Sequence, residues 1–331
     1  MHQGREGDEG RLRRPSAKPR SARGAPALPP TERIHPASRD LDRLSTAEIV
    51  RRLHAEDAVA FRAVSRVLPD IARAAEAAGH ALAAGGRIIY VGAGTSGRLG
   101  ALDAAECPPT FGARPEQVIA LIAGGARALR RAVEGAEDDA EQGAREIRRA
   151  RADPRDLVIG ISASASTPYV LGALREARAA GARTVLVSCN APGGNRPPAD
   201  QVIALDTGPE LVAGSTRLKA GTATKLVLNA ISTAAFVRLG KIYRGHMVDL
   251  RATNQKLRAR AHRMVAELTG LPEHEAVRLL SRAGGSPGLA VAMHLTGLTR
   301  RGAARELAAR GLRGLETPRS GRRPRGRRRR A

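Results

Sequence analysis

Residues 87–100 read Arg87-Ile-Ile-Tyr-Val-Gly-Ala-Gly-Thr-Ser-Gly-Arg-Leu-Gly100 and carry the strongest fold signal in the chain. The apolar run from Ile88 to Val91 predicts a strand, and the Gly, Ser and Thr residues after it predict a tight turn into a helix. Backbone N–H groups at such a helix start, with the helix dipole, bind anions. Glu106 follows, and we expect it within reach of the ligand. The stretch therefore predicts a phosphate site beside an acid.

A dinucleotide site is the alternative interpretation, because Gly92 to Gly97 fits the pattern G-x-G-x-x-G. That pattern expects an acidic residue at the end of the following strand, where it would bind the ribose. The next predicted strand, 118–122, ends in Ala123-Gly124-Gly125 and offers no carboxylate. Thr95 and Ser96 supply hydroxyl donors instead. We therefore favour a phosphomonoester over a nicotinamide cofactor.

Strands and helices are predicted to alternate along most of the chain. Strands are expected at 87–92, 118–122, 156–161, 183–188 and 201–205. Helices are expected at 46–84, 98–105, 126–150, 169–180 and 222–239. This alternation predicts an α/β fold in which helices cover both faces of a parallel sheet, with ligands beyond the carboxyl ends of the strands. From residue 254 onward, short helices with Gly and Pro breaks predict a small C-terminal helical region.

The net charge of +24 is unevenly distributed. The Pro-, Gly- and Arg-rich segments 1–30 and 318–331 carry net charges of +4 and +8. We predict disordered tails at 1–30 and 316–331, because such segments bury too little apolar surface to fold. A domain at 31–250 and a small helical domain at 251–315 lie between them. Arg outnumbers Lys throughout, so we interpret the tails as compositional bias rather than as a nucleic-acid site.

The two cysteines, Cys107 and Cys189, show no metal-ligand spacing and no disulfide pattern. A reducing, cytoplasmic setting is therefore expected. Neither a signal-peptide pattern nor an apolar run of membrane-spanning length is evident, so we expect no membrane partner.

Two further loops are candidate anion sites. Ile161-Ser-Ala-Ser-Ala-Ser-Thr-Pro-Tyr169 follows the third strand, with Thr167 as the predicted N-cap and Pro168 as the first helical residue. Two such loops on one sheet can converge on one phosphate. The segment 208–222 mixes Gly, hydroxyls, Arg217 and Lys219, which predicts anion recognition, although a solvated surface pair is the alternative.

General acid–base chemistry needs two ionisable groups with separate roles. Glu106 is one candidate, because Pro108-Pro109 stiffen the backbone after it. The second lies in the acidic segment Val133-Glu-Gly-Ala-Glu-Asp-Asp139. Spacing alone leaves a solvated helix face as the alternative interpretation of this segment. It also leaves four candidates open for the second group: Glu134, Glu137, Asp138 and Asp139.

Long motifs in this chain resemble those of the N-acetylmuramic acid 6-phosphate etherases, a family of the sugar-isomerase (SIS) superfamily. The motifs are Tyr90-Val-Gly-Ala-Gly-Thr-Ser-Gly-Arg-Leu-Gly100, Leu102-Asp-Ala-Ala-Glu-Cys-Pro-Pro-Thr-Phe111, Val133-Glu-Gly-Ala-Glu-Asp-Asp139 and Gly214-Ser-Thr-Arg-Leu-Lys-Ala-Gly-Thr222. The resemblance extends from about Thr31 to Leu315. It implies an SIS-type parallel sheet in a flavodoxin-like three-layer sandwich, and a homodimer without metal or organic cofactor.

The resemblance also implies a reaction and its residues. N-acetylmuramate 6-phosphate would lose its D-lactyl ether to give N-acetylglucosamine 6-phosphate and D-lactate. Glu106 matches the acid that protonates the departing lactate oxygen, and Glu137 matches the base that removes the C2 proton. Substrate and phosphate contacts are expected from Gly94, Thr95, Ser96, Ser162, Ser164, Thr167, Ser215, Arg217 and Lys219. An SIS-type sugar-phosphate isomerase and a non-catalytic sugar-phosphate regulator are the alternatives.

One loop departs from the family pattern. Ala165-Ser166 stands where the family usually has glycine followed by arginine. Alanine restricts a turn that glycine permits at positive φ, and serine removes a cation near the phosphate.

Overall fold

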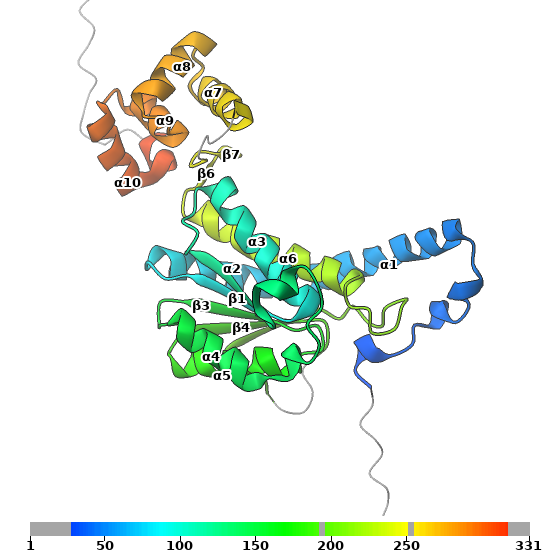
Figure 1. Cartoon of the computed structure of the whole chain (residues 1–331). Helices are drawn as coiled ribbons and strands as arrows, with labels where there is room; N and C mark the ends of the chain where they lie inside the picture. The colour runs from blue at the N-terminus through cyan, green and yellow to red at the C-terminus, as the bar shows by residue number, and fades with distance from the viewer. Residues whose placement is uncertain (1–27, 192–195, 251–254, 317–331) are drawn as a thin grey trace, which may run out of the picture.

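A wholly parallel five-stranded sheet forms the centre of the molecule, with the strand order β2-β1-β3-β4-β5 (Figure 1). The structure is a computed structural model that describes residues 28–191, 196–250 and 255–316. The strands are β1 (Ile88–Gly92), β2 (Val118–Ile122), β3 (Leu157–Ile161), β4 (Arg183–Ser188) and β5 (Gln201–Ala204). The predicted strands coincide with these to within a residue. Short apolar runs between turns are typical of strands buried on both faces.

Helices cover both faces of the sheet. The helices of the α/β part are α1 (Thr46–Arg66), α2 (Leu68–Ala83), α3 (Gly94–Phe111), α4 (Ala140–Ala150), α5 (Pro168–Ala179) and α6 (Lys219–Arg238). Alternate residues of β1 enter different cores: Ile88 and Tyr90 pack with residues of α2, α3 and α6, whereas Ile89 and Val91 pack with residues of α5. The predicted three-layer arrangement is confirmed. Between residue 28 and α1, three short 3₁₀ turns occur: η1 (Pro30–Glu32), η2 (Pro36–Ser38) and η3 (Leu41–Arg43).

Two predicted helices have the wrong limits. The helix expected at 98–105 begins at Gly94 and continues through Pro108 to Phe111. The helix expected at 126–150 is wrong in its first half, where only the 3₁₀ turns η4 (Gly125–Leu129) and η5 (Ala136–Asp138) occur. Helix α4 begins after Asp139, whose side chain accepts a hydrogen bond from the Gln142 N–H at 2.7 Å. That N-cap satisfies one of the first free N–H groups and fixes the start of the helix.

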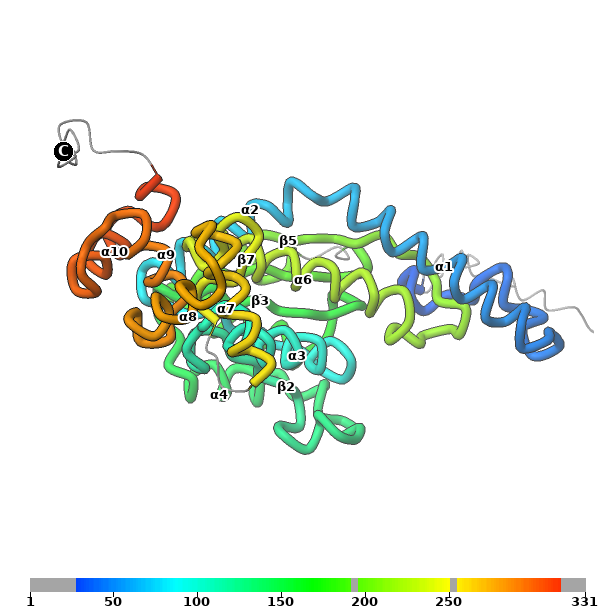
Figure 2. Tube along the Cα trace, turned by 90° about the horizontal axis from the view of Figure 1, so that it is seen from above, coloured from blue at the N-terminus to red at the C-terminus, as the bar shows by residue number. Residues whose placement is uncertain are grey.

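The C-terminal part is a small helical bundle with its own core. Its elements are β6 (Ile242–Tyr243), β7 (His246–Met247), α7 (Gln255–Thr269), α8 (Glu273–Arg282), α9 (Pro287–Thr296) and α10 (Arg300–Glu316). The bundle lies at one end of the molecule and α1 at the other (Figures 1 and 2). Its core includes Tyr243, Val248 and Leu250, which precede the boundary predicted at residue 251. That boundary stays a prediction, and most of both predicted tails lies outside the described residues.

Helix α6 is, within the described ranges, the one helix long and apolar enough to cross a membrane by length and composition. Its apolar side chains nevertheless serve the protein core. Val227, Ile231 and Phe236 are buried in the cluster that covers β1 and β3, and the Phe236 ring stacks on Phe111 of α3 at 4.5 Å between centroids. We interpret α6 as the core helix of the sandwich.

Candidate active site at the carboxyl ends of the strands

Glycine allows the first loop to bring β1 and α3 into direct contact. A Cβ on Gly92 would lie 2.6 Å from the Gly97 backbone nitrogen, and a Cβ on Gly97 would lie 2.5 Å from Cγ1 of Ile122. Neither position can hold a side chain without moving the helix. These two glycines therefore set the helix start against the sheet.

The start of α3 presents free backbone donors beyond the end of β1. The first backbone bond inside the turn runs from the Gly97 N–H to the Ala93 oxygen at 3.2 Å. The N–H groups of Gly94, Thr95 and Ser96 consequently have no acceptor within the helix. With the positive end of the helix dipole, these free donors suit the binding of an anion, and the phosphate site expected here stays a prediction.

The second loop contains a network of hydroxyl groups. The hydroxyl oxygens of Ser162 and Thr167 lie 2.8 Å apart, and those of Ser162 and Ser164 lie 3.3 Å apart. Ser166 donates its hydroxyl to Ser164 at 2.9 Å. Pro168 is the first residue of α5 as predicted, but Thr167 makes no side-chain cap because its hydroxyl is bonded to Ser162. Ser162 is buried, and its hydroxyl holds the partly buried hydroxyls of Ser164 and Thr167 in place.

Both loops line one cavity of about 360 Å³. Of the predicted binding residues, Gly94, Thr95, Ser96, Ser164 and Thr167 line it, together with the proposed base Glu137. The remaining lining residues are Glu32, Ala93, Asp138, Ile161, Ala163, Ser166, Pro168, Gly214 and Thr216. Strand register explains the convergence, because Gly92 and Ile161, the last residues of β1 and β3, are direct neighbours. The cavity lies where ligands bind in open parallel sheets.

The structure distinguishes among the four acidic residues that the sequence left as candidates for the second acid–base group. Asp139 caps α4 and pairs with Arg145 at 3.2 Å, so its carboxylate has a structural partner. Glu134 is exposed and does not line the cavity. Glu137 and Asp138, on the turn η5, both line it. The positive φ of Gly135, at 71°, directs the chain into this turn.

Glu106 lies away from this cavity within the single chain. It is exposed on α3, twelve residues after Gly94, which corresponds to about 18 Å along the helix axis at about 1.5 Å per residue. The expectation that Glu106 lies within reach of the ligand held by the turn does not hold inside one chain. One helix turn earlier, buried Asp103 accepts hydrogen bonds from Tyr90, Asn229 and Ser232, which fixes α3 against α6.

The third loop contributes Gly214 and Thr216 to the cavity, whereas the predicted residues Ser215, Arg217 and Lys219 do not line it. Lys219 is buried, and its ammonium group pairs with Glu56 of α1. Buried Glu210 accepts hydrogen bonds from the N–H groups of Lys219 and Ala220 at the start of α6. Burial raises the pKa of Glu210 above its usual value, although these donors oppose the shift. The ammonium group of Lys219 is thus occupied by Glu56, and its expected contact with the substrate stays a prediction.

Sequence reasoning did not single out Glu32, Thr216 or Ser166 as site residues. Glu32 precedes α1 and reaches the cavity because buried Thr31 is hydrogen-bonded to Asn190, 159 residues away. No local signal in the sequence predicts that contact. Thr216 lies in the segment 214–222 and Ser166 in the segment 161–169, so their hydroxyl groups could have marked them as candidate ligand-binding residues.

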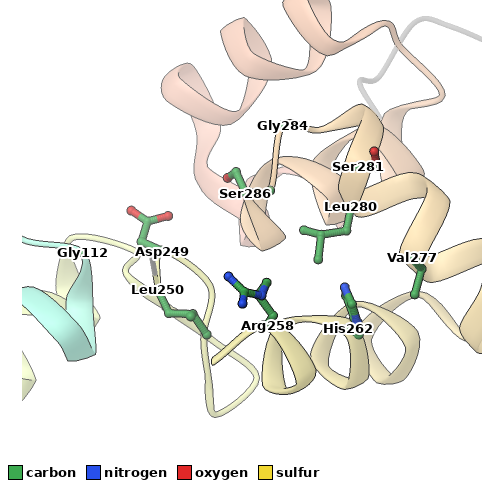
Figure 3. A pocket seen from close by; sticks show the side chains of 11 residues that line it. Gly112, Asp249, Leu250, Arg258, His262, Val277, Leu280, Ser281, Gly284 and Ser286 are labelled. Carbon is green, nitrogen blue, oxygen red and sulfur yellow. The ribbon is translucent and has the colours of Figure 1, made fainter. Parts of the chain in front are cut away.

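A second cavity, of about 710 Å³, lies between the end of α3 and the helical bundle (Figure 3). Arg258 and His262 of α7 face Leu280 of α8 across it, and Gly112 borders it at the end of α3. No predicted site residue lines this cavity.

Comparisons with known proteins place the chain in a family. Residues 70–178 match the family described as the glucokinase regulatory protein N-terminal SIS domain. N-acetylmuramic acid 6-phosphate etherases from Salmonella typhi and Salmonella typhimurium are each 51% identical over 279 residues, which cover 84% of this chain and 94% of the relative.

Solved structures show more distant likenesses. A phosphoheptose isomerase from Francisella tularensis aligns with a TM-score of 0.44 and 13% identity, over 59% of this chain and 100% of that one. One from Neisseria gonorrhoeae aligns with a TM-score of 0.42 and 17% identity, over 58% and 98%. Identity of 51% over nearly the whole length of the etherases is decisive, so the chain belongs to the N-acetylmuramic acid 6-phosphate etherase family.

Proposed function

We propose that this protein cleaves the D-lactyl ether of N-acetylmuramate 6-phosphate and releases N-acetylglucosamine 6-phosphate and D-lactate. The observation that carries the proposal is the cavity in which the two hydroxyl loops and Glu137 meet. Its relatives are named for this etherase activity. A cytoplasmic location fits a substrate of this kind. No metal or organic cofactor is included in the proposed reaction.

The cavity suits an elimination followed by a hydration. The free N–H groups of α3 and the hydroxyls of Ser164 and Thr167 bind the 6-phosphate. Glu137 removes the C2 proton of the ring-opened sugar, which is acidic because it lies α to the aldehyde. The C3–oxygen bond then breaks, and a general acid protonates the lactate oxygen. Water adds to C3 of the resulting enal and restores the proton at C2.

Glu106 serves as that acid in a homodimer, where the second copy brings its Glu106 to the cavity. Its distance along α3 from the phosphate-binding turn supports this arrangement. Leu102, on the same helix, is 51% exposed, and Phe61 of α1 is 58% exposed. Helix α1 projects from the body of the molecule (Figures 1 and 2). In the proposed homodimer, these two exposed side chains would be covered by the second copy.

Release of D-lactate from N-acetylmuramate 6-phosphate tests the proposed activity. Glu106→Gln and Glu137→Gln should each fold normally and lose about 10²- to 10⁴-fold in kcat, because an amide cannot exchange the proton. A variant that keeps the wild-type kcat would remove its glutamate from the mechanism.

Complementation of the two variants tests the shared site. In a heterodimer of Glu106→Gln and Glu137→Gln subunits, one of the two sites has both intact glutamates. Random pairing should therefore restore about a quarter of the wild-type activity, since a two-fold dimer has two equivalent sites. Co-expressed variants that stay inactive while forming heterodimers would contradict the shared site.

A further inference from the structure

The charged residues that line the active-site cavity are acidic, whereas the chain as a whole is strongly basic. The sequence holds 56 Lys and Arg residues against 32 Asp and Glu residues. Within the described part of the chain, however, the residues that line the cavity include three acids, Glu32, Glu137 and Asp138, and neither Lys nor Arg. Of these three acids, only Glu137 has a role in the proposed reaction. A second carboxylate from a different segment, Glu32, has no role in it.

Glu32 is held in place by a buried contact far along the sequence. Thr31 is fully buried, and its N–H donates to Oδ1 of Asn190 at 3.3 Å. Nδ2 of Asn190 in turn donates to the Thr31 hydroxyl at 2.8 Å. Asn190 lies two residues after β4, at the carboxyl edge of the sheet. The pair therefore fixes the segment before α1 beside the strand ends.

Glu32 is an exposed residue, and its carboxylate lies at the cavity without a partner of its own. Its Oε2 would lie 3.3 Å from a Cβ built on Gly214, which also lines the cavity. The neighbouring Arg33 points elsewhere, with its Nε donating to the Leu28 oxygen at 2.9 Å. No hydrogen bond or ion pair joins the Glu32 side chain to any residue of the described ranges. In those ranges, no three His, Cys, Asp or Glu side chains are grouped to hold a metal ion.

We propose that Glu32 is a positioning residue whose carboxylate accepts hydrogen bonds from hydroxyl or amide N–H groups of the sugar. This inference rests on the proposed function. A carboxylate repels the 6-phosphate, so Glu32 must face an uncharged donor on the ligand. Carboxylate acceptors make hydrogen bonds about twice as strong as neutral acceptors do. Glu32 thus orients the ring while the loops hold the phosphate.

Binding of two ligands to Glu32→Gln separates this role from a structural one. Glutamine keeps the shape of the side chain and removes its charge. N-acetylglucosamine 6-phosphate should bind about tenfold more weakly to the variant, because a charge-assisted bond becomes a neutral one. Inorganic phosphate should bind equally or more tightly, because a like charge is removed. Glu76→Gln, on the exposed surface of α2, is the matched control and should change neither affinity.

The outcomes separate the two proposals. Equal weakening of both ligands would show a structural effect and overturn the role of Glu32, as would unchanged or tighter binding of the sugar phosphate. Glu32→Asp keeps the charge, so its phosphate affinity should match the wild type while its sugar-phosphate affinity falls in part. Wild-type protein that releases D-lactate while Glu32→Gln binds normally would overturn the role of Glu32 alone. Wild-type protein that neither binds the sugar phosphate nor releases D-lactate would overturn both proposals.

Discussion

Ala165 stands in a left-handed backbone conformation, with φ at 64°, in the loop that presents Ser164 and Thr167. This conformation costs a non-glycine residue about 1–2 kcal/mol. Glycine avoids that cost, although it loses about 0.5–1 kcal/mol more in conformational entropy on folding. The difference predicts that Ala165→Gly raises the free energy of unfolding by about 0.5–1 kcal/mol, or Tm by about 1 °C in a chain of this length.

Chemical denaturation with a matched control measures this effect. Ala163 lies in the same loop but has no positive φ. Ala163→Gly should therefore lower the free energy of unfolding by at least about 0.5–1 kcal/mol, because no relief of a positive φ offsets the entropy loss. The two substitutions remove the same methyl group and are expected to change stability in opposite directions. A loss of stability in Ala165→Gly as large as that in Ala163→Gly would refute the reasoning about backbone strain.

Three further changes test other parts of the site. Ser164→Ala should raise KM by at least tenfold, because a hydrogen bond to a charged group contributes about 1.5–3 kcal/mol; an unchanged KM would remove Ser164 from the phosphate site. Lys219→Met should lower the free energy of unfolding by about 3 kcal/mol, because it leaves Glu56 without its buried partner; a large rise in KM at unchanged stability would instead support substrate binding. Burial raises the pKa of Cys107 to about 12. The contribution of its protonated thiol to the free energy of unfolding should therefore be complete below about pH 9 and decrease as the pH rises toward 12. Rapid alkylation of native Cys107 at pH 8 would contradict this.

The sheet could be predicted because its strands are short apolar runs between turns. Ile88 to Val91 and Leu157 to Ile161 are buried on both faces. Strands of this kind are continuous apolar runs without alternating polar residues, which makes them easy to recognise in the sequence. The helix limits were less predictable. Residues 126–139 contain favourable helix formers, but Gly135 adopts a positive φ and Asp139 caps a later start. A local signal, Asp139 three residues before Gln142, was present in the sequence and was outweighed by the overall helical pattern.

Part of the candidate site could likewise be predicted from the sequence, and part could not. Gly94 to Ser96 and Ser164 to Thr167 could be predicted, because each loop directly follows a strand and neighbouring parallel strands end at the same edge. Glu32 could not, since its place depends on the contact between Thr31 and Asn190. The charge of Lys219 in a loop rich in glycine and hydroxyl groups predicts ligand binding, but it does not reveal that Glu56 lies against it.

The most direct test of the proposed elimination and hydration is the reaction of N-acetylmuramate 6-phosphate in oxygen-18-labelled water. The proposed mechanism breaks the bond between C3 and the ether oxygen, so D-lactate keeps that oxygen and water supplies the new hydroxyl at C3. Fragmentation of the products by mass spectrometry should locate the label at C3 of N-acetylglucosamine 6-phosphate and find none in D-lactate. Label in the hydroxyl group of D-lactate would show cleavage on the lactyl side and contradict the mechanism.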